Sequence, residues 1–250
     1  MFGIVAVAQS PLALPAIGTA VLLLGGFVAL QRRRREPLMP LSLFRAPNLG
    51  IGNAVTALLG AAWIPMWFFL NMFLQQVLGL GALESGLALL PMTLAIMVLM
   101  IAATERIVAR IGPKAALVYG LSLLATALAL FARMPADGTL LAHVIPASLI
   151  AALGMAMAYV PSVIVATAGA RPEEGGLASG LVNTTYQVGS ALGLAAMVAI
   201  AGSVSSGTDA LGDVTSGFSA AFTGAAIVAG LAAFVAWVGV RMPAPGASHE

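Results

Sequence analysis

The chain has 250 residues, of which 60% are hydrophobic and 8% are charged, and its formal net charge is +2. This composition excludes a soluble domain, whose surface needs about a quarter of charged residues. It also excludes a disordered chain, because too much apolar surface would stay in water. The absence of cysteine from the sequence excludes disulfide bonds, thiolate metal sites and a cysteine nucleophile.

Apolar runs of about 20 residues recur along the chain, and such runs are typical of membrane-spanning helices. In lipid each run must form a helix, since no water is there to satisfy its backbone hydrogen-bonding groups. The predicted spans are seven, each bounded by a charge, a Gly/Pro pair or a polar loop: residues 12–31, 50–75, 84–104, 115–132, 140–168, 177–202 and 218–240. We therefore expect an all-α integral membrane protein.

The basic residues between these spans predict the orientation of the chain. Ten of the 11 Lys and Arg residues lie in alternate segments: Arg32, Arg33, Arg34, Arg35, Arg45, Arg106, Arg110, Lys114, Arg171 and Arg241. Only Arg133 lies in one of the opposite segments. Because cytoplasmic loops carry an excess of Lys and Arg, we expect the N-terminus outside the cell and the C-terminus in the cytoplasm.

Four segments together resemble a known transporter family: REPLMPLSLFR (35–45), FFLNMFLQQVLGLGALESGLALLPMTL (68–94), ERIVARIGPKAAL (105–117) and RPEEGGLASGLVNTTYQVGSALGLA (171–195). They are similar to the C-terminal half of major facilitator superfamily transporters, in particular to the fourteen-helix drug:proton antiporters of the multidrug efflux branch. The third segment resembles the basic cytoplasmic motif of the superfamily. The fourth resembles the penultimate helix of this branch.

The resemblance implies a domain organisation. Residues 1–31 would be a partial or extra linker transmembrane segment, 32–47 a basic cytoplasmic linker, 48–241 the C-terminal six-helix bundle and 242–250 a cytoplasmic tail. Such transporters contain inverted three-helix repeats, so spans two to four would match spans five to seven. The expected fold is then a major-facilitator-type six-helix bundle with one preceding linker helix.

The resemblance also implies a function. We expect a secondary transporter of the bacterial inner or plasma membrane that exports drugs or other small amphipathic molecules by proton antiport and alternating access. It would need no cofactor, because the proton gradient supplies the energy. Its partners would be the lipid bilayer, the substrate, and either a missing N-terminal half or a second copy of the chain. An enzyme and a nucleic-acid partner are not expected.

The second span carries polar and aromatic residues on one side at helical spacing: Asn53, Thr56, Gly60, Trp63, Trp67, Asn71 and Gln75. Aromatic and amide groups together suit a cavity for bulky, partly apolar substrates, and aromatic faces can also hold a cation. Helix packing and anchoring of aromatic rings at the membrane interface explain the same pattern. We therefore predict Asn53, Trp63, Trp67 and Asn71 as candidates for a substrate pathway.

The sixth span carries a second polar stripe, made of Gly176, Gly180, Asn183, Gln187 and Ser190. At 100° per residue these positions fall close to one line along the helix. Amide side chains are costly against lipid, so we expect Asn183 and Gln187 to face the bundle interior, as a cavity wall or as a helix contact. Gly176 and Gly180 have the spacing of small residues at a close helix–helix contact.

The segment 105–114 carries Glu105, Arg106, Arg110, Gly112 and Lys114. In the family that it resembles, such residues form a charged latch between cytoplasmic helix ends, and Gly112 with Pro113 would make a tight turn. The position of the motif's Asp is Ala109 here, and Glu105 stands in place of its first Gly. Charges that only set the topology are the simpler explanation.

Other classes of protein remain to be weighed. A seven-helix receptor fits the predicted topology, but a retinal protein needs a lysine in its last span, and the only lysine is Lys114. The chain holds no phosphate-binding loop of an ATP-driven pump. No ionisable residue falls in the middle of a predicted span, so the proton-carrying group of an antiporter would lie elsewhere. A truncated fragment that inserts but transports nothing is the other alternative.

Overall fold

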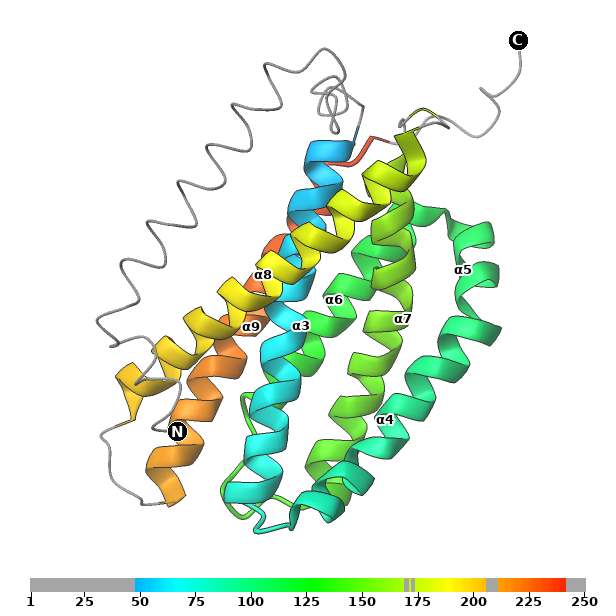
Figure 1. Ribbon diagram of the computed structural model, residues 1–250. Coiled ribbons are helices and arrows are strands. Elements are labelled where there is room, and N and C mark those ends of the chain that lie inside the picture. Colours follow the sequence, from blue (N-terminus) through cyan, green and yellow to red (C-terminus); the bar gives the residue numbers. More distant parts are fainter. Residues whose placement is uncertain (1–47, 169–170, 172–173, 206–210, 242–250) are drawn as a thin grey trace. The chain divides into compact units, whose positions relative to one another are not determined.

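The computed structural model describes residues 48–168, 171, 174–205 and 211–241 (Figure 1). The first predicted span, 12–31, the basic segment 32–47 and the tail 242–250 lie outside these residues. The described unit is all-helical. Each helix can cross a membrane because it satisfies its own backbone hydrogen-bonding groups.

Six long helices form the unit, and all six are long and apolar enough to cross a membrane. They are α3 (Leu49–Gln76), α4 (Ala82–Ala102), α6 (Pro113–Phe131), α7 (Ile145–Thr167), α8 (Gly175–Val204) and α9 (Leu211–Gly239). A π-helical turn, η2 (Leu140–Val144), leads directly into α7, and the short helix α5 (Thr104–Ile111) joins α4 to α6. The second to seventh predicted spans are thus confirmed.

Two predicted boundaries are wrong. The segment expected as the loop 105–114 is mostly helix α5, because its apolar residues fall on one face and its charges suit the helix dipole, with Glu105 in the first turn and Arg110 in the last. Helix α9 begins at Leu211 instead of 218. Asp213 lies in its first turn, where an acidic group is favourable, and the Ser205 hydroxyl donates to Asp213 Oδ2 at 2.9 Å.

The order of the helices places their ends in two groups. Helices α3, α6 and α8 begin, and α4, α7 and α9 end, at what we call the basic end of the unit (Figure 1). The described cations at this end are Arg106, Arg110, Lys114, Arg171 and Arg241. Arg133, which follows α6, is the only Lys or Arg of the described residues at the opposite end. The fold therefore keeps the charge separation that the sequence shows.

The packing follows a two-fold exchange of three-helix repeats. The exchange replaces α3 by α7, α4 by α8 and α6 by α9, and the reverse. Under it, the contact of α8 with α3 becomes the contact of α4 with α7. In the same way, the contact of α6 with α7 becomes the contact of α9 with α3. The contacts of α6 with α9 and of α3 with α7 map onto themselves. Since α3 and α7 run in opposite directions, the repeats are inverted, as in many transporters.

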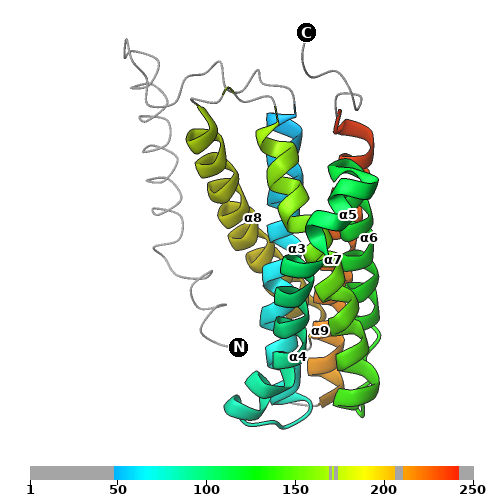
Figure 2. The same ribbon diagram turned by 90° about the vertical axis from the view of Figure 1, so that its right-hand side faces the viewer.

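The exchange fails at one place, and this exposes α4. Helix α8 packs along α9, whereas α4 has at most marginal contact with α6. Helices α4 and α8 are the two least covered spans, and Figure 2 shows α8 on one side of the unit with α6 and α9 on the other. Residues of α3, α7, α6 and α9 supply most of the core.

Aromatic rings fill the core toward the Arg133 end. The ring of Phe69 on α3 lies 5.7 Å from that of Phe218 on α9, and Phe131 on α6 lies 5.4 Å from Phe222 on α9. All four side chains are buried. Ring pairs at such distances are favourable beyond the area that they bury, so they fix α9 between α3 and α6.

Candidate functional site

Helix α8 carries two amide side chains on a surface that no other described helix covers. Asn183 and Gln187 are both exposed, although they stand near the middle of a membrane-spanning helix. The prediction that they face the interior of the bundle is therefore wrong for the described unit. The helix instead buries Ala178, Val182, Gly189 and Gly193, which are small or apolar. We call the exposed surface at Asn183 and Gln187 the amide face.

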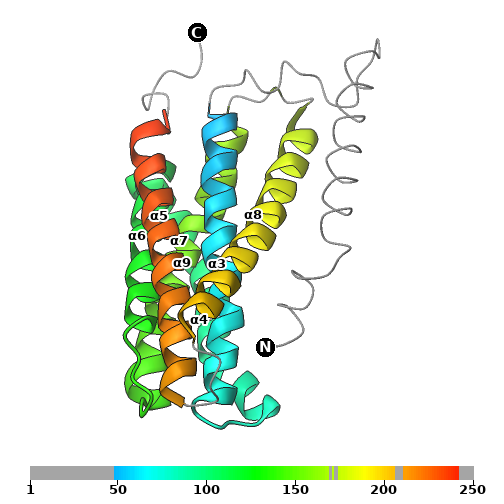
Figure 3. The same ribbon diagram turned by 90° about the vertical axis from the view of Figure 1, so that its left-hand side faces the viewer.

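The direction of α8 explains this arrangement. Figure 3 shows α8 crossing α3 and separating from it toward the basic end. The close contact lies beyond the amide face, where a Cβ on Gly189 would stand 2.1 Å from the Ala57 carbonyl oxygen and one on Gly193 would stand 2.3 Å from Ala61 Cα. Only residues without a Cβ permit this approach.

The predicted packing pair, Gly176 and Gly180, does not make such a contact. No described atom lies within 4 Å of a Cβ built on either glycine, because α8 has already left α3 at this point. The pair that packs is Gly189 and Gly193, which has the same spacing and was missed. Both pairs look alike in the sequence, and only the crossing point of the helices distinguishes them.

A small pocket opens where α8 separates from α3, and α7 forms its third wall. Its volume is about 180 Å³, and it is lined by Thr56, Tyr159, Val163, Ser179, Val182, Asn183 and Tyr186. We call it the phenol pocket after its two tyrosines, whose rings meet edge to face with centroids 5.8 Å apart. It lies in the half of the membrane nearer the basic end, since Thr56 is close to the start of α3 and Ser179 to the start of α8.

The hydroxyls beside the phenol pocket are held by their own helices. Thr56 Oγ1 donates to the Gly52 carbonyl at 2.8 Å, and Ser190 Oγ donates to the Tyr186 carbonyl at 2.8 Å. Their lone pairs remain as acceptors, since a hydroxyl can both donate and accept. With the Asn183 amide and the two phenols, the pocket offers polar groups of both kinds beside an apolar floor.

The polar stripe of α3 is only partly brought to this pocket. Thr56 lines it, whereas Asn53, Trp63, Trp67 and Asn71 do not. Trp63 is buried, and its ring packs edge to face on Trp67 at 6.0 Å. Helix packing is thus what the structure shows for the two tryptophans.

The amides of α3 are tied to their own helix. The Asn53 amide donates to the Leu49 carbonyl at 2.8 Å, and the Gln75 amide donates to the Asn71 side chain. Asn53 Oδ1 is buried and has no hydrogen-bond partner among the described residues. A buried amide oxygen without a donor is unfavourable. A donor for Asn53 Oδ1 would have to come from water or from residues outside the described part of the chain.

The basic motif lies on α5 and at the start of α6. Gly112 has φ +82°, a left-handed value that favours glycine, and Pro113 opens α6, so the predicted tight turn is confirmed. Glu105, Arg106, Arg110 and Lys114 form no ion pair with one another or with the other described residues. A charged latch at this position therefore requires a partner outside the part of the chain that the structure describes.

The residue that anchors this region was not predicted. Thr104, at the joint of α4 and α5, is buried, and its hydroxyl donates to the Ala156 carbonyl of α7 at 3.1 Å. At the same end, Arg171 donates to the Glu174 carboxylate, which lowers the pKa of Glu174 from its ordinary value. The sequence contains no signal for the Thr104 contact, because its acceptor lies in another repeat.

The fold defines a multi-pass helical membrane protein that is built from paired inverted repeats and exposes two amide side chains on α8. The family model described as Major Facilitator Superfamily matches residues 2–194. The chain belongs to this superfamily, whose members are transport proteins.

Curated relatives of the chain include proteins named for antibiotic export or resistance. The chain is 31% identical over 219 residues to the cephamycin export protein CmcT of Amycolatopsis lactamdurans, covering 88% of this chain and 45% of the relative. It is 35% identical over 190 residues to the lincomycin resistance protein of Streptomyces lincolnensis, covering 76% and 39%. It is 34% identical over 181 residues to the tetracenomycin C resistance and export protein of Streptomyces glaucescens, covering 72% and 33%. The chain thus spans less than half the length of these relatives.

Proposed function

We propose that this chain is the C-terminal bundle of a fourteen-helix drug exporter, which moves small amphipathic compounds of the antibiotic type out of the cell by alternating access. The family and the printed names of the relatives, which include export and resistance proteins for four different antibiotics, support this proposal. The chain acts in transport and not as an enzyme.

The observation that carries the proposal is the amide face beside the phenol pocket. Two exposed amides in the middle of a span would be costly against lipid. A polar cavity removes this cost, because substrate or water then satisfies Asn183 and Gln187. The pocket of about 180 Å³ is smaller than the range of about 300–1,000 Å³ that is typical of small-molecule sites. It thus suits one ring or polar group of a larger substrate, whose remainder contacts other residues.

A second helix bundle is proposed to close the cavity beside the amide face. Helices α4 and α8 are the least covered spans, and the chain spans less than half of its relatives. We propose that an N-terminal bundle, or a second copy of the chain, covers them. In this arrangement residues 1–31 form a linker transmembrane segment, 32–47 a cytoplasmic linker, 48–241 the C-terminal bundle and 242–250 a cytoplasmic tail.

The basic end is proposed to face the cytoplasm, with the protein in the bacterial inner or plasma membrane, because positive charge is retained inside. Transport is proposed to be driven by the proton gradient, without a cofactor. The Asp, Glu and His residues of the described part all lie near helix ends or in loops. The proton-carrying group is therefore expected in the other bundle.

The test is a drug-efflux assay on the protein expressed from its own gene with all upstream coding sequence. Asn183→Leu and Gln187→Leu are compared with Ser122→Ala, an exposed α6 position whose hydroxyl donates only to the Val118 carbonyl of its own helix. We expect the first two variants to lose resistance to part of the substrate range at equal membrane expression, and the control to keep it. Unchanged efflux in both Leu variants would overturn the cavity assignment.

A further inference from the structure

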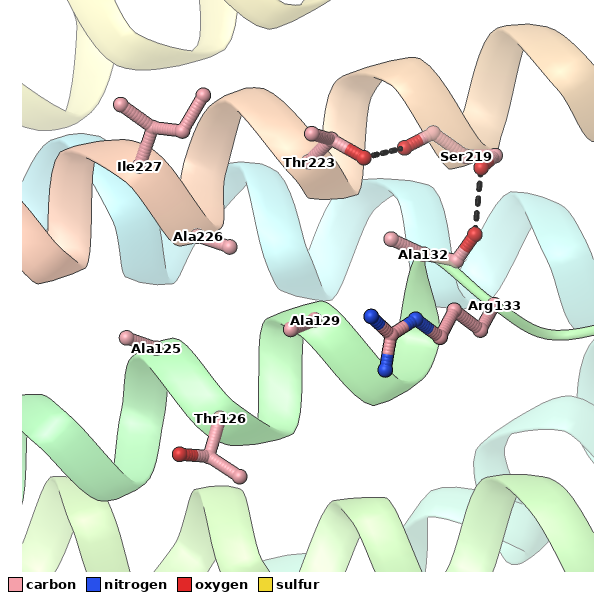
Figure 4. A pocket seen from close by; sticks show the side chains of 9 residues that line it. All are labelled: Ala125, Thr126, Ala129, Ala132, Arg133, Ser219, Thr223, Ala226 and Ile227. Carbon is pink, nitrogen blue, oxygen red and sulfur yellow. Dashed lines mark hydrogen bonds between the residues drawn. The ribbon is translucent and has the colours of Figure 1, made fainter.

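A groove runs between α6 and α9 in the half of the unit nearer the Arg133 end. Its volume is about 600 Å³. Ala125, Ala129 and Ala132 form one wall and Ser219, Thr223 and Ala226 the other, with Arg133 at its end (Figure 4). No residue of α8 lines the groove. The two helices that form it lie on the opposite side of the unit from α8 (Figure 2), and thus away from the amide face.

The polar groups of the groove are already used. Ser219 Oγ donates to the Ala132 carbonyl at 2.5 Å, and Thr223 Oγ1 donates to the Ser219 carbonyl at 2.8 Å. Both hydroxyl hydrogens are therefore taken up by backbone carbonyls, and four alanines supply much of the rest of the two walls. An alkyl chain fits such a surface better than a polar solute does, because it displaces no hydrogen bond.

Arg133 adds a charge at one end of this apolar groove. Its side chain is exposed, and Figure 4 shows it extending from the end of α6 back along the groove. It forms no ion pair with a carboxylate of the described residues. A guanidinium near the membrane surface is stabilised by a phosphate, which it binds through paired hydrogen bonds.

We propose that the α6–α9 groove binds an anionic phospholipid, with an acyl chain between the two helices and the phosphate on Arg133. From Ala125 to Arg133 the groove is about 12 Å long at 1.5 Å per residue, which compares with about 15 Å for half of the hydrocarbon core. The dimensions thus match one leaflet. Transport substrate is the less suitable occupant, because the polar groups that would select it lie on the opposite side and nearer the other end.

The experiment measures lipid retention by native mass spectrometry of the full-length protein, purified from nanodiscs that contain phosphatidylglycerol and phosphatidylethanolamine. We expect the wild-type protein to retain phosphatidylglycerol preferentially. Arg133→Gln removes the charge and is expected to weaken retention by about tenfold, which is the order expected for a charged hydrogen bond. Arg133→Lys keeps part of the effect. Ala129→Leu fills the groove and weakens retention with the charge intact.

Matched controls separate the site from general effects. Arg110→Gln removes a cation at the basic end, and Ser122→Leu enlarges an exposed α6 residue outside the groove; both should retain lipid as the wild type does. Equal retention in Arg133→Gln and Ala129→Leu, or equal retention of the two lipids by the wild type, would overturn the proposal. So would a loss of drug binding in Ala129→Leu with lipid retention unchanged, because substrate would then be the occupant.

Discussion

Asn48 and Arg241 are 193 residues apart and bind each other in both directions. The Asn48 side-chain amide donates to the Arg241 carbonyl at 2.6 Å, and the Arg241 backbone N–H donates to Asn48 Oδ1 at 2.8 Å. The pair joins the residue before α3 to the residues that follow α9 at the basic end. It satisfies a helix terminus with a side chain instead of water.

Asn48→Ala is expected to lower the free energy of unfolding by about 1–3 kcal/mol, through two lost hydrogen bonds and a left-handed backbone without its preferred residue. Asn48 has φ +67°, which glycine adopts without strain. Asn48→Gly should therefore be less destabilising than Asn48→Ala, although it loses the same bonds. Thermal unfolding in detergent measures both, and equal losses would show that the backbone conformation contributes nothing.

Gly189→Ala is expected to destabilise the contact of α8 with α3 by about 1–3 kcal/mol, since its Cβ would stand 2.1 Å from a carbonyl oxygen. Gly180→Ala is the matched control on the same helix, and no described atom lies within 4 Å of the added Cβ. The melting temperatures of the two variants are compared, and we expect the larger decrease for Gly189→Ala. A larger loss in Gly180→Ala would mean that the Gly176–Gly180 face contacts a segment outside the described residues.

Thr104→Val is expected to loosen the joint of α4 and α5 from α7, because it keeps the side-chain shape and removes the hydroxyl that donates to Ala156. The expected loss is about 1 kcal/mol. Hydrogen exchange of the α5 amides should become faster. Thr184→Val is the control, since the Thr184 hydroxyl is exposed and donates only to Gly180 of its own helix. The same change in exchange for both variants would contradict this role of Thr104.

A cysteine at position 183 or 187 is expected to react with a water-soluble maleimide. The chain contains no cysteine, so Asn183→Cys and Gln187→Cys each introduce a single thiol into this part of the protein. Ile227→Cys on α9 is the control. Ile227 is exposed, but its neighbours are mostly apolar and we expect lipid to cover them, so a thiol there should stay unlabelled. Protection of position 183 by an exported drug would support the phenol pocket. Labelling of all three positions alike would contradict a water-filled cavity at α8.

The amide face shows how far one sequence predicts a site. Residue spacing placed Asn183 and Gln187 on one line of α8, and the structure keeps them together. The described helices leave both side chains exposed instead of facing the interior of the bundle, while Asn183 lines the phenol pocket. The cost of a polar group in lipid demands a partner, but it does not say whether the same bundle supplies that partner. Tyr159 and Tyr186 were missed because they lie on different helices, and no spacing within one segment relates them.

The sequence alone determined that the chain spans a membrane, where the six described spans lie and which of their ends carry the positive charge. These properties depend on the length and polarity of local segments, because a helix in lipid satisfies its own backbone. Only the tertiary structure decided which glycines pack, where α8 leaves α3, and which surfaces stay uncovered. These depend on the angle at which two helices cross, and that angle is set by contacts between residues far apart in the chain.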